Sequence, residues 1–148
     1  MNPPYIAAHD WLVACTIATE VPPVGIGAFT PEMIPAALRA VADVIRNRVA
    51  AGSWGHSPVE VVLAKNQFSA VCREDYWRKA VAGLWQLSHV LKALAVWQTP
   101  QCPDNVGGAT YYYSPVSMRP VGAIPSWVAG LTEVVVPGID PQFFRFYK

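Results

Sequence analysis

The stretch Cys15-Thr16-Ile17-Ala18-Thr19-Glu20 ends an apolar segment that begins at about Tyr5, and Val21-Pro22-Pro23 follows it at once. A proline disfavours helical geometry in the residue before it and cannot continue a helix, so we expect a helix over residues 5–20. Because this segment is apolar on almost every side, the helix should be buried. Glu20 would then lie against an apolar wall, where lost hydration raises the pKa of a carboxyl group towards a value that suits a general acid. The alternative is an exposed carboxylate at an ordinary helix end.

The composition indicates one compact domain over residues 1–148. Hydrophobic residues make up 53% of the chain and charged residues 14%, which argues against disorder. The net charge is +1 and the Lys and Arg residues are scattered, so nucleic acid is not an expected partner. No apolar run is long enough to cross a membrane, and no positive charge precedes the first apolar segment. We therefore expect neither a transmembrane helix nor a secretory signal peptide.

The cysteines and histidines favour free thiols and no metal site. Cys15, Cys72 and Cys102 are odd in number and form no CxxC pair, which argues against a disulfide framework. The histidines are far apart in the sequence and share no ligand spacing. We therefore expect no metal and no cofactor.

Three more helices are predicted downstream. Apolar residues recur at spacings of three and four from Ile34 to Val49, and the helix they form should begin between Thr30 and Pro35 and end at Ala51-Gly52. On this helix, Asp43, Arg46 and Arg48 should point away from the apolar face, with Asp43 towards solvent. Ser57-Pro58-Val59-Glu60 fits a capping box that opens a short helix to Ala64. A long helical pattern runs from Arg73 to about Gln98.

Two other segments break the helical pattern. Asn66-Gln67-Phe68-Ser69 lies between two predicted helices and is either a ligand-facing corner or an ordinary turn. From Val106 onwards the chain contains Tyr111-Tyr112-Tyr113, Val134-Val135-Val136 and an aromatic end, all of strand-like composition. The fold class is therefore mainly α (α+β), with short C-terminal strands or extended loops.

Four motifs stand in order along the chain. They are the Glu that ends an apolar first helix, the decapeptide Ala40-Val41-Ala42-Asp43-Val44-Ile45-Arg46-Asn47-Arg48-Val49, the triplet Gln67-Phe68-Ser69, and Gly108-Ala109-Thr110-Tyr111-Tyr112-Tyr113-Ser114-Pro115. In this order they resemble the cell-wall hydrolase family named for the spore-cortex lytic enzyme SleB. Trp127 and Phe144 to Tyr147 are candidates for the Trp and the aromatic pair that close the family's pattern.

The resemblance implies a lysozyme-like fold and cleavage of the peptidoglycan glycan strand between N-acetylmuramic acid and N-acetylglucosamine. It makes Glu20 the catalytic residue and peptidoglycan the partner. The chain departs from the family in the Pro- and Gly-rich insertion that follows Glu20, and in lacking Gly-Asn-His before its final aromatics. Both departures concern the shape of the cleft.

The reaction type depends on a second carboxylate. Glycoside hydrolases usually pair the acid with a second carboxylate about 5–10 Å away. Asp10 lies nearly three helical turns before Glu20, roughly 15 Å, and neither Glu32 nor Asp43 is a convincing partner. A site with one carboxylate fits a lytic transglycosylase, in which the C6 hydroxyl of muramic acid attacks the anomeric carbon and gives a 1,6-anhydro product.

Six residues are candidates for substrate contact. If the tyrosine run is extended, Tyr111 and Tyr113 face one way and Tyr112 the other, so that one face can meet the sugar and the other can pack inwards. Gln67 and Ser69 offer hydrogen bonds to N-acetyl or hydroxyl groups, and Phe68 lies between them. Asn47 and Arg48 are equally well explained as structural ties of the second helix to its neighbours.

Two rival functions remain open. In a peptidoglycan amidase or peptidase, Cys15 or Cys72 would be the nucleophile and His56 or His89 the base. In a non-catalytic wall-binding module, the fold would be kept without the reaction. For the enzyme, the missing signal peptide predicts an endolysin of a phage or prophage, made in the host cytoplasm and acting on the wall after release. A virion-associated enzyme or the lysis protein of a gene-transfer particle would look the same. We expect a monomer.

Overall fold

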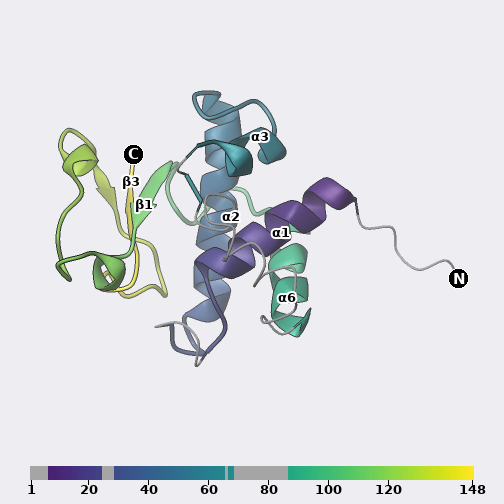
Figure 1. Ribbon diagram of the computed structural model, residues 1–148, viewed down its shortest axis with the longest axis horizontal. Helices are drawn as coiled ribbons and strands as arrows, with labels where there is room; N and C mark the ends of the chain where they lie inside the picture. The colour runs from purple at the N-terminus through teal and green to yellow at the C-terminus, as the bar shows by residue number, and fades with distance from the viewer. Residues whose placement is uncertain (1–6, 25–28, 66, 69–86) are drawn as a thin grey trace, which may run out of the picture.

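The computed structural model describes residues 7–24, 29–65, 67–68 and 87–148. Helices α1 (Ala8–Glu20), α2 (Ile34–Ala51), α3 (Pro58–Leu63) and α6 (Leu87–Gln98) precede three short strands, β1 (Tyr111–Tyr113), β2 (Glu133–Val134) and β3 (Arg145–Tyr147). In Figure 1 the sheet and its loops lie on one side of α2, while α1, α3 and α6 lie on the other. The predicted class, a mainly helical domain with short C-terminal strands, is confirmed.

Helix α1 is the buried helix that the sequence predicts. Every residue from Val13 to Thr19 is buried, because α2, α3 and α6 all pack against this helix. The two buried threonines, Thr16 and Thr19, donate their hydroxyls to the carbonyls four residues back, at 2.9 and 2.8 Å. Their polar groups are therefore satisfied without a partner from another helix. The helix ends at Glu20, as the following prolines predict.

Helix α2 begins at Ile34, with Pro35 in its first turn, and ends at Ala51 before Gly52. Gly52 adopts a left-handed conformation with φ of 76°, which a glycine accepts without strain. The expectation that Asp43 faces solvent is wrong, because its side chain is 1% exposed. Asp43 accepts hydrogen bonds from the Arg46 guanidinium at 3.0 Å and from the backbone N–H of Asn105 at 3.4 Å. The loop after α6 thus covers the Asp43 carboxylate, although the periodicity of the helix alone predicted that it faces solvent.

The predicted cap of α3 is present. The Ser57 hydroxyl accepts from the backbone N–H of Glu60 at 3.2 Å, and the Glu60 carboxylate accepts from the backbone N–H of His56 at 2.6 Å. Of the long helix predicted from Arg73, the part from Leu87 to Gln98 is observed as α6. The part from Arg73 to Gln86 lies outside the described residues.

The three strands form an antiparallel sheet in the order β1-β3-β2. Tyr112 pairs with Phe146 across β1 and β3, and Val134 pairs with Phe146 across β2 and β3. Phe146 is 1% exposed and belongs to the same core as the buried residues of α1 and α2. The aromatic C-terminus therefore attaches the sheet to the helical part.

Candidate active site

The site is centred on a contact between the last residue of α1 and the middle residue of β1. The Tyr112 hydroxyl donates a hydrogen bond of 2.7 Å to Oε2 of Glu20, across 92 residues of sequence. Burial, and then the negative charge of Glu20, raises the pKa of Tyr112 well above its usual value. The phenol therefore stays protonated at all ordinary pH values and keeps donating to the carboxylate.

Helix α2 fixes the start of β1 through two neighbouring side chains. Asn47 Nδ2 donates to the carbonyl of Ala109 at 3.0 Å, and Arg48 Nε donates to the carbonyl of Thr110 at 2.7 Å. These two carbonyls belong to the residues just before Tyr111, so both hydrogen bonds set the position of the strand that carries Tyr112. The structural role expected for Asn47 and Arg48 is therefore to hold the strand that carries Tyr112 of the candidate site.

Arg48 is a buried cation beside this site. Its side chain is 4% exposed and its guanidinium lies over the rings of Trp54, at 5.0 Å, and Phe68, at 5.3 Å. Burial lowers the pKa of Arg48, while Tyr112 and Glu20 act in the opposite direction. Its Nη1 atom has no hydrogen-bond partner among the described residues. Besides the two aromatic faces and the Thr110 carbonyl, the groups that interact electrostatically with the guanidinium of Arg48 are Tyr112, Glu20 and Tyr111.

The other face of β1 carries an aromatic cluster. Tyr111 and Tyr113 both contact Trp127, with ring centroids at 5.3 and 5.8 Å, and Trp54 contacts Tyr111 at 5.3 Å. Trp127 is 37% exposed, whereas Tyr113 is buried. The predicted alternation of the tyrosine run is therefore observed: Tyr112 points to Glu20, and its two neighbours pack on the opposite side.

The structure places the remaining predicted contact residues in different surroundings. Gln67 is exposed, and its Nε2 donates to the carbonyl of Lys65 at 3.3 Å. Phe68 is 1% exposed and packs in the core beneath Arg48. Ser69 lies outside the described residues. Of the six candidates, Tyr112 is the one with a hydrogen bond to Glu20 in the described part of the chain.

Arg48 interacts electrostatically with Glu20, although the sequence explained it equally well as a structural tie and did not place it among the candidates for substrate contact. The Asn-Arg pair of the decapeptide indicated a special position for Arg48, because a charged residue inside an apolar signature needs a partner if it is buried. The sequence could not say which strand that partner would come from.

The other described carboxylates have different surroundings from Glu20. Asp10 accepts from the Trp97 indole at 3.0 Å, and Asp43 pairs with Arg46. Three more accept backbone N–H groups close to them in sequence: Glu60, Asp104 and Asp140. Glu133 pairs with Arg145 at 3.5 Å, and Glu32 is exposed. Glu74 and Asp75 lie outside the described residues.

The thiols and histidines of the described chain do not assemble into a nucleophilic pair. Cys15 is buried in α1, and burial raises the pKa of its thiol, which opposes thiolate formation. His89 is also buried, with its Nε2 2.6 Å from the carbonyl of Val21. Cys72 lies outside the described residues.

In the described ranges no group of three or more metal-ligating side chains occurs. A search of the same ranges finds no helix that is long and apolar enough to span a membrane.

Comparison with known protein families gives a match over most of the chain. The cell wall hydrolase family matches residues 35–144, from the first turn of α2 to the start of β3, and this region includes the decapeptide, Tyr112 and Trp127. Helix α1 and Glu20 precede the matched region, and the Glu20–Tyr112 hydrogen bond joins them to it. No curated protein and no solved structure matches the chain. Since the family model covers about three quarters of its length, the chain belongs to the cell wall hydrolase family.

Proposed function

We propose that this protein cleaves the glycan strand of peptidoglycan between N-acetylmuramic acid and N-acetylglucosamine, as a lytic transglycosylase with Glu20 as its acid and base. The observation that carries the proposal is the Glu20–Tyr112 hydrogen bond. It joins the carboxylate to the tyrosine motif within the region that matches the cell wall hydrolase family.

The first step needs a proton donor at the bridge oxygen. Glu20 in its protonated form gives its proton to this oxygen as the bond to the anomeric carbon breaks, and the leaving sugar departs as an alcohol. Tyr112 holds one carboxyl oxygen of Glu20 by its hydrogen bond, which fixes the direction of the group. The nearby positive charge of Arg48 stabilises the carboxylate that this step leaves behind.

The second step needs a base. The Glu20 carboxylate takes the proton of the C6 hydroxyl of muramic acid while that oxygen bonds to the anomeric carbon, which closes the 1,6-anhydro ring and restores the acid form. The two steps together use the same carboxyl group twice and need no water. Among the described carboxylates, Asp10, Asp43 and Glu133 have hydrogen-bond or ion-pair partners away from Glu20, which supports a site with one carboxylate.

For the biological role we propose an endolysin of a phage or prophage, acting as a monomer on the wall after its release from the host cytoplasm. This role is supported by Cys15 and Cys102, which are free thiols in the described part of the chain and suit synthesis in a reducing cytoplasm.

The test is mass spectrometry of the soluble products from purified peptidoglycan. Parent protein, Glu20→Gln and the matched control Glu133→Gln, which removes a carboxylate from the sheet, are compared. We expect 1,6-anhydromuramic ends from the parent and the control, and a rate about 10³-fold lower for Glu20→Gln. Reducing muramic ends would mean that the protein is a muramidase and not a transglycosylase. Freed peptides on intact glycan would overturn the glycosidase altogether.

A further inference from the structure

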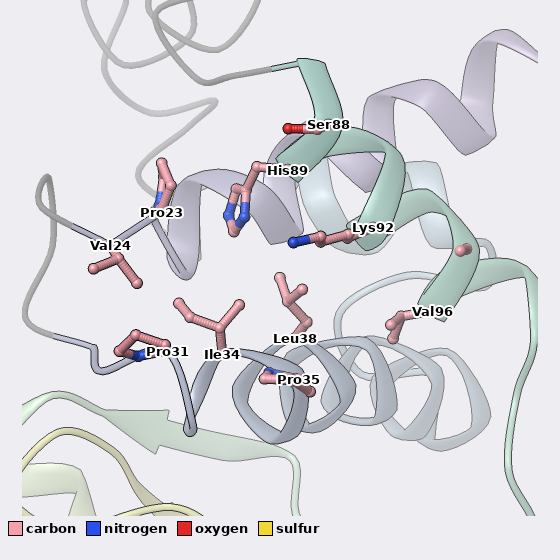
Figure 2. Close-up of a pocket in the computed structure, with 11 residues that line it drawn as sticks. Pro23, Val24, Pro31, Ile34, Pro35, Leu38, Ser88, His89, Lys92 and Val96 are labelled. Atoms are coloured by element: carbon pink, nitrogen blue, oxygen red, sulfur yellow. The ribbon is translucent and has the colours of Figure 1, made fainter.

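A pocket of about 580 Å³ lies between the end of α1, the start of α2 and the length of α6. Its floor is apolar, with Ile34 and Leu38 of α2 and two prolines beside them, Pro31 and Pro35. Figure 2 shows Lys92 and His89 of α6 on the opposite wall, with the ammonium group of Lys92 directed into the cavity above Ile34 and Leu38. The volume lies within the usual range for small-molecule sites.

The pocket starts within a short distance of Glu20. Pro23, on its wall, is three residues after Glu20, so their Cα atoms are separated by at most about 11 Å. His89, on the facing wall, has its Nε2 2.6 Å from the carbonyl of Val21, the residue that follows Glu20. The same histidine therefore lines the pocket and holds the end of the helix that carries the candidate catalytic carboxylate.

The lining selects a ligand with an apolar body and an anionic group. Lys92 is exposed and forms no ion pair with a carboxylate of the described residues. Around it, apart from Ser88 at the rim and the ring of His89, the lining consists of aliphatic side chains and prolines. A cation above an aliphatic floor suits a short peptide with methyl side chains and free carboxylates.

We propose that this pocket binds the peptide stem that muramic acid carries in peptidoglycan, with a stem carboxylate on Lys92 and alanine methyl groups on the apolar floor. The inference rests on the proposed function, because it takes the reacting sugar to lie at Glu20. An extended stem of four residues spans about 13 Å, which covers the distance from Glu20 to Pro23. The enzyme would then recognise a strand by its peptide as well as by its sugars.

Binding can be measured apart from catalysis with a synthetic muramoyl tetrapeptide, which contains no glycosidic bond to cleave. Isothermal titration calorimetry compares the parent with Lys92→Gln, with Ala95→Trp, which fills the pocket from α6, and with Lys148→Gln, a matched loss of one charge on the C-terminal residue. We expect affinity to fall at least about fivefold in the first two variants and to stay unchanged in the third. Absence of binding to the parent, or equal affinity in all four proteins, overturns the inference.

Kinetics on two substrates distinguish this inference from the function on which it rests. One substrate is intact peptidoglycan, and the other is glycan strands stripped of peptides by an amidase. We expect Lys92→Gln to raise KM on the intact substrate about fivefold, with kcat and the activity on stripped strands unchanged. If the parent cleaves both substrates with the same KM and Lys92→Gln changes neither, the pocket proposal falls and the catalytic one stands. If the parent cleaves neither substrate, the proposed function falls, and the calorimetry alone then decides the pocket.

Discussion

Arg46 and Arg48 lie two residues apart on α2 and face two different regions of the molecule. Arg46 pairs with Asp43 at 3.0 Å, donates to the carbonyls of Val96 and Trp97, and lies over the Trp97 ring at 4.6 Å. Arg48 holds the carbonyl of Thr110, and its charge acts on Glu20 and Tyr112. Arg46 is thus neutralised within the helical part, whereas Arg48 is held by a carbonyl and aromatic faces beside the candidate site.

With Glu20 as the proposed catalytic acid, the difference assigns one arginine of the helix to stability and the other to chemistry. A buried cation with a carboxylate partner contributes to the structure, and removal of one member leaves the other buried and charged. A buried cation beside a reacting carboxyl group instead favours the charged form of that group. The two arginines are therefore matched controls for each other.

The largest effect is expected for Arg48→Met. Loss of the charge that stabilises the Glu20 carboxylate should lower kcat about 100-fold, or about 2.7 kcal/mol. Because the carboxylate is then less favoured, the alkaline limb of the pH–rate profile should move to higher pH. Arg48→Lys keeps the charge and should keep the limb in place. If the alkaline limb of the pH–rate profile stays in place in Arg48→Met, Arg48 acts only as a structural residue.

Arg46→Met should show the opposite pattern, with activity close to that of the parent and lower stability. Arg46 is 22% exposed and Asp43 1% exposed, so we expect a loss of about 2 kcal/mol, below the value for a fully buried pair. Burial already raises the pKa of Asp43, and Arg46 opposes that rise. Without Arg46 the pKa of Asp43 rises further, so the deficit should be smaller near pH 4, where only the contacts of Arg46 with Val96 and Trp97 are lost, and complete at pH 7. Urea unfolding at both pH values measures it, and a deficit independent of pH would contradict this account.

Tyr112→Phe tests the contact between the end of α1 and strand β1. It removes the hydrogen bond to Glu20 and keeps the ring that packs on Phe144 and Phe146. We expect kcat to fall about tenfold with KM unchanged, because the bond orients the carboxylate and does not hold the substrate. Tyr147→Phe removes the same atom from the other face of the sheet and should leave kcat unchanged. Equal losses in the two variants would indicate a general effect on the sheet.

The smallest effect concerns His89. Burial lowers the pKa of His89 below its usual 6.5, so the unfolded chain binds a proton at that pH while the folded ring stays neutral. The free energy of unfolding should therefore fall as the pH drops through about 6.5, by at most about 1.4 kcal/mol per pH unit. In His89→Gln this dependence of the free energy of unfolding on pH should disappear. In His56→Gln, at an exposed position, it should remain. Thermal melts between pH 5 and 7.5 provide the comparison.

The helical part of this fold follows from local rules, and the site depends on long-range contacts. The end of α1 at Glu20 is set by the next two prolines, the end of α2 by Gly52, and the cap of α3 by Ser57 and Glu60, all within a few residues. The alternation of Tyr111 to Tyr113 also follows from strand geometry. The backbone contacts that cover Asp43 and Arg48 could not be predicted, because Asn105 and Thr110, which provide them, are each 62 residues away in sequence.

The hydrogen bond between Glu20 and Tyr112 also has a consequence for the time at which activity arises. Strand β1 is held by β3, which ends at Tyr147, one residue before the end of the described chain. Glu20 therefore acquires its tyrosine partner only after the chain has been synthesised as far as β3, because this contact joins residues that are 92 apart in sequence. Until then a nascent chain carries the carboxylate without the strand that orients it. The order of synthesis thus sets a delay between the folding of α1 and the assembly of the complete site.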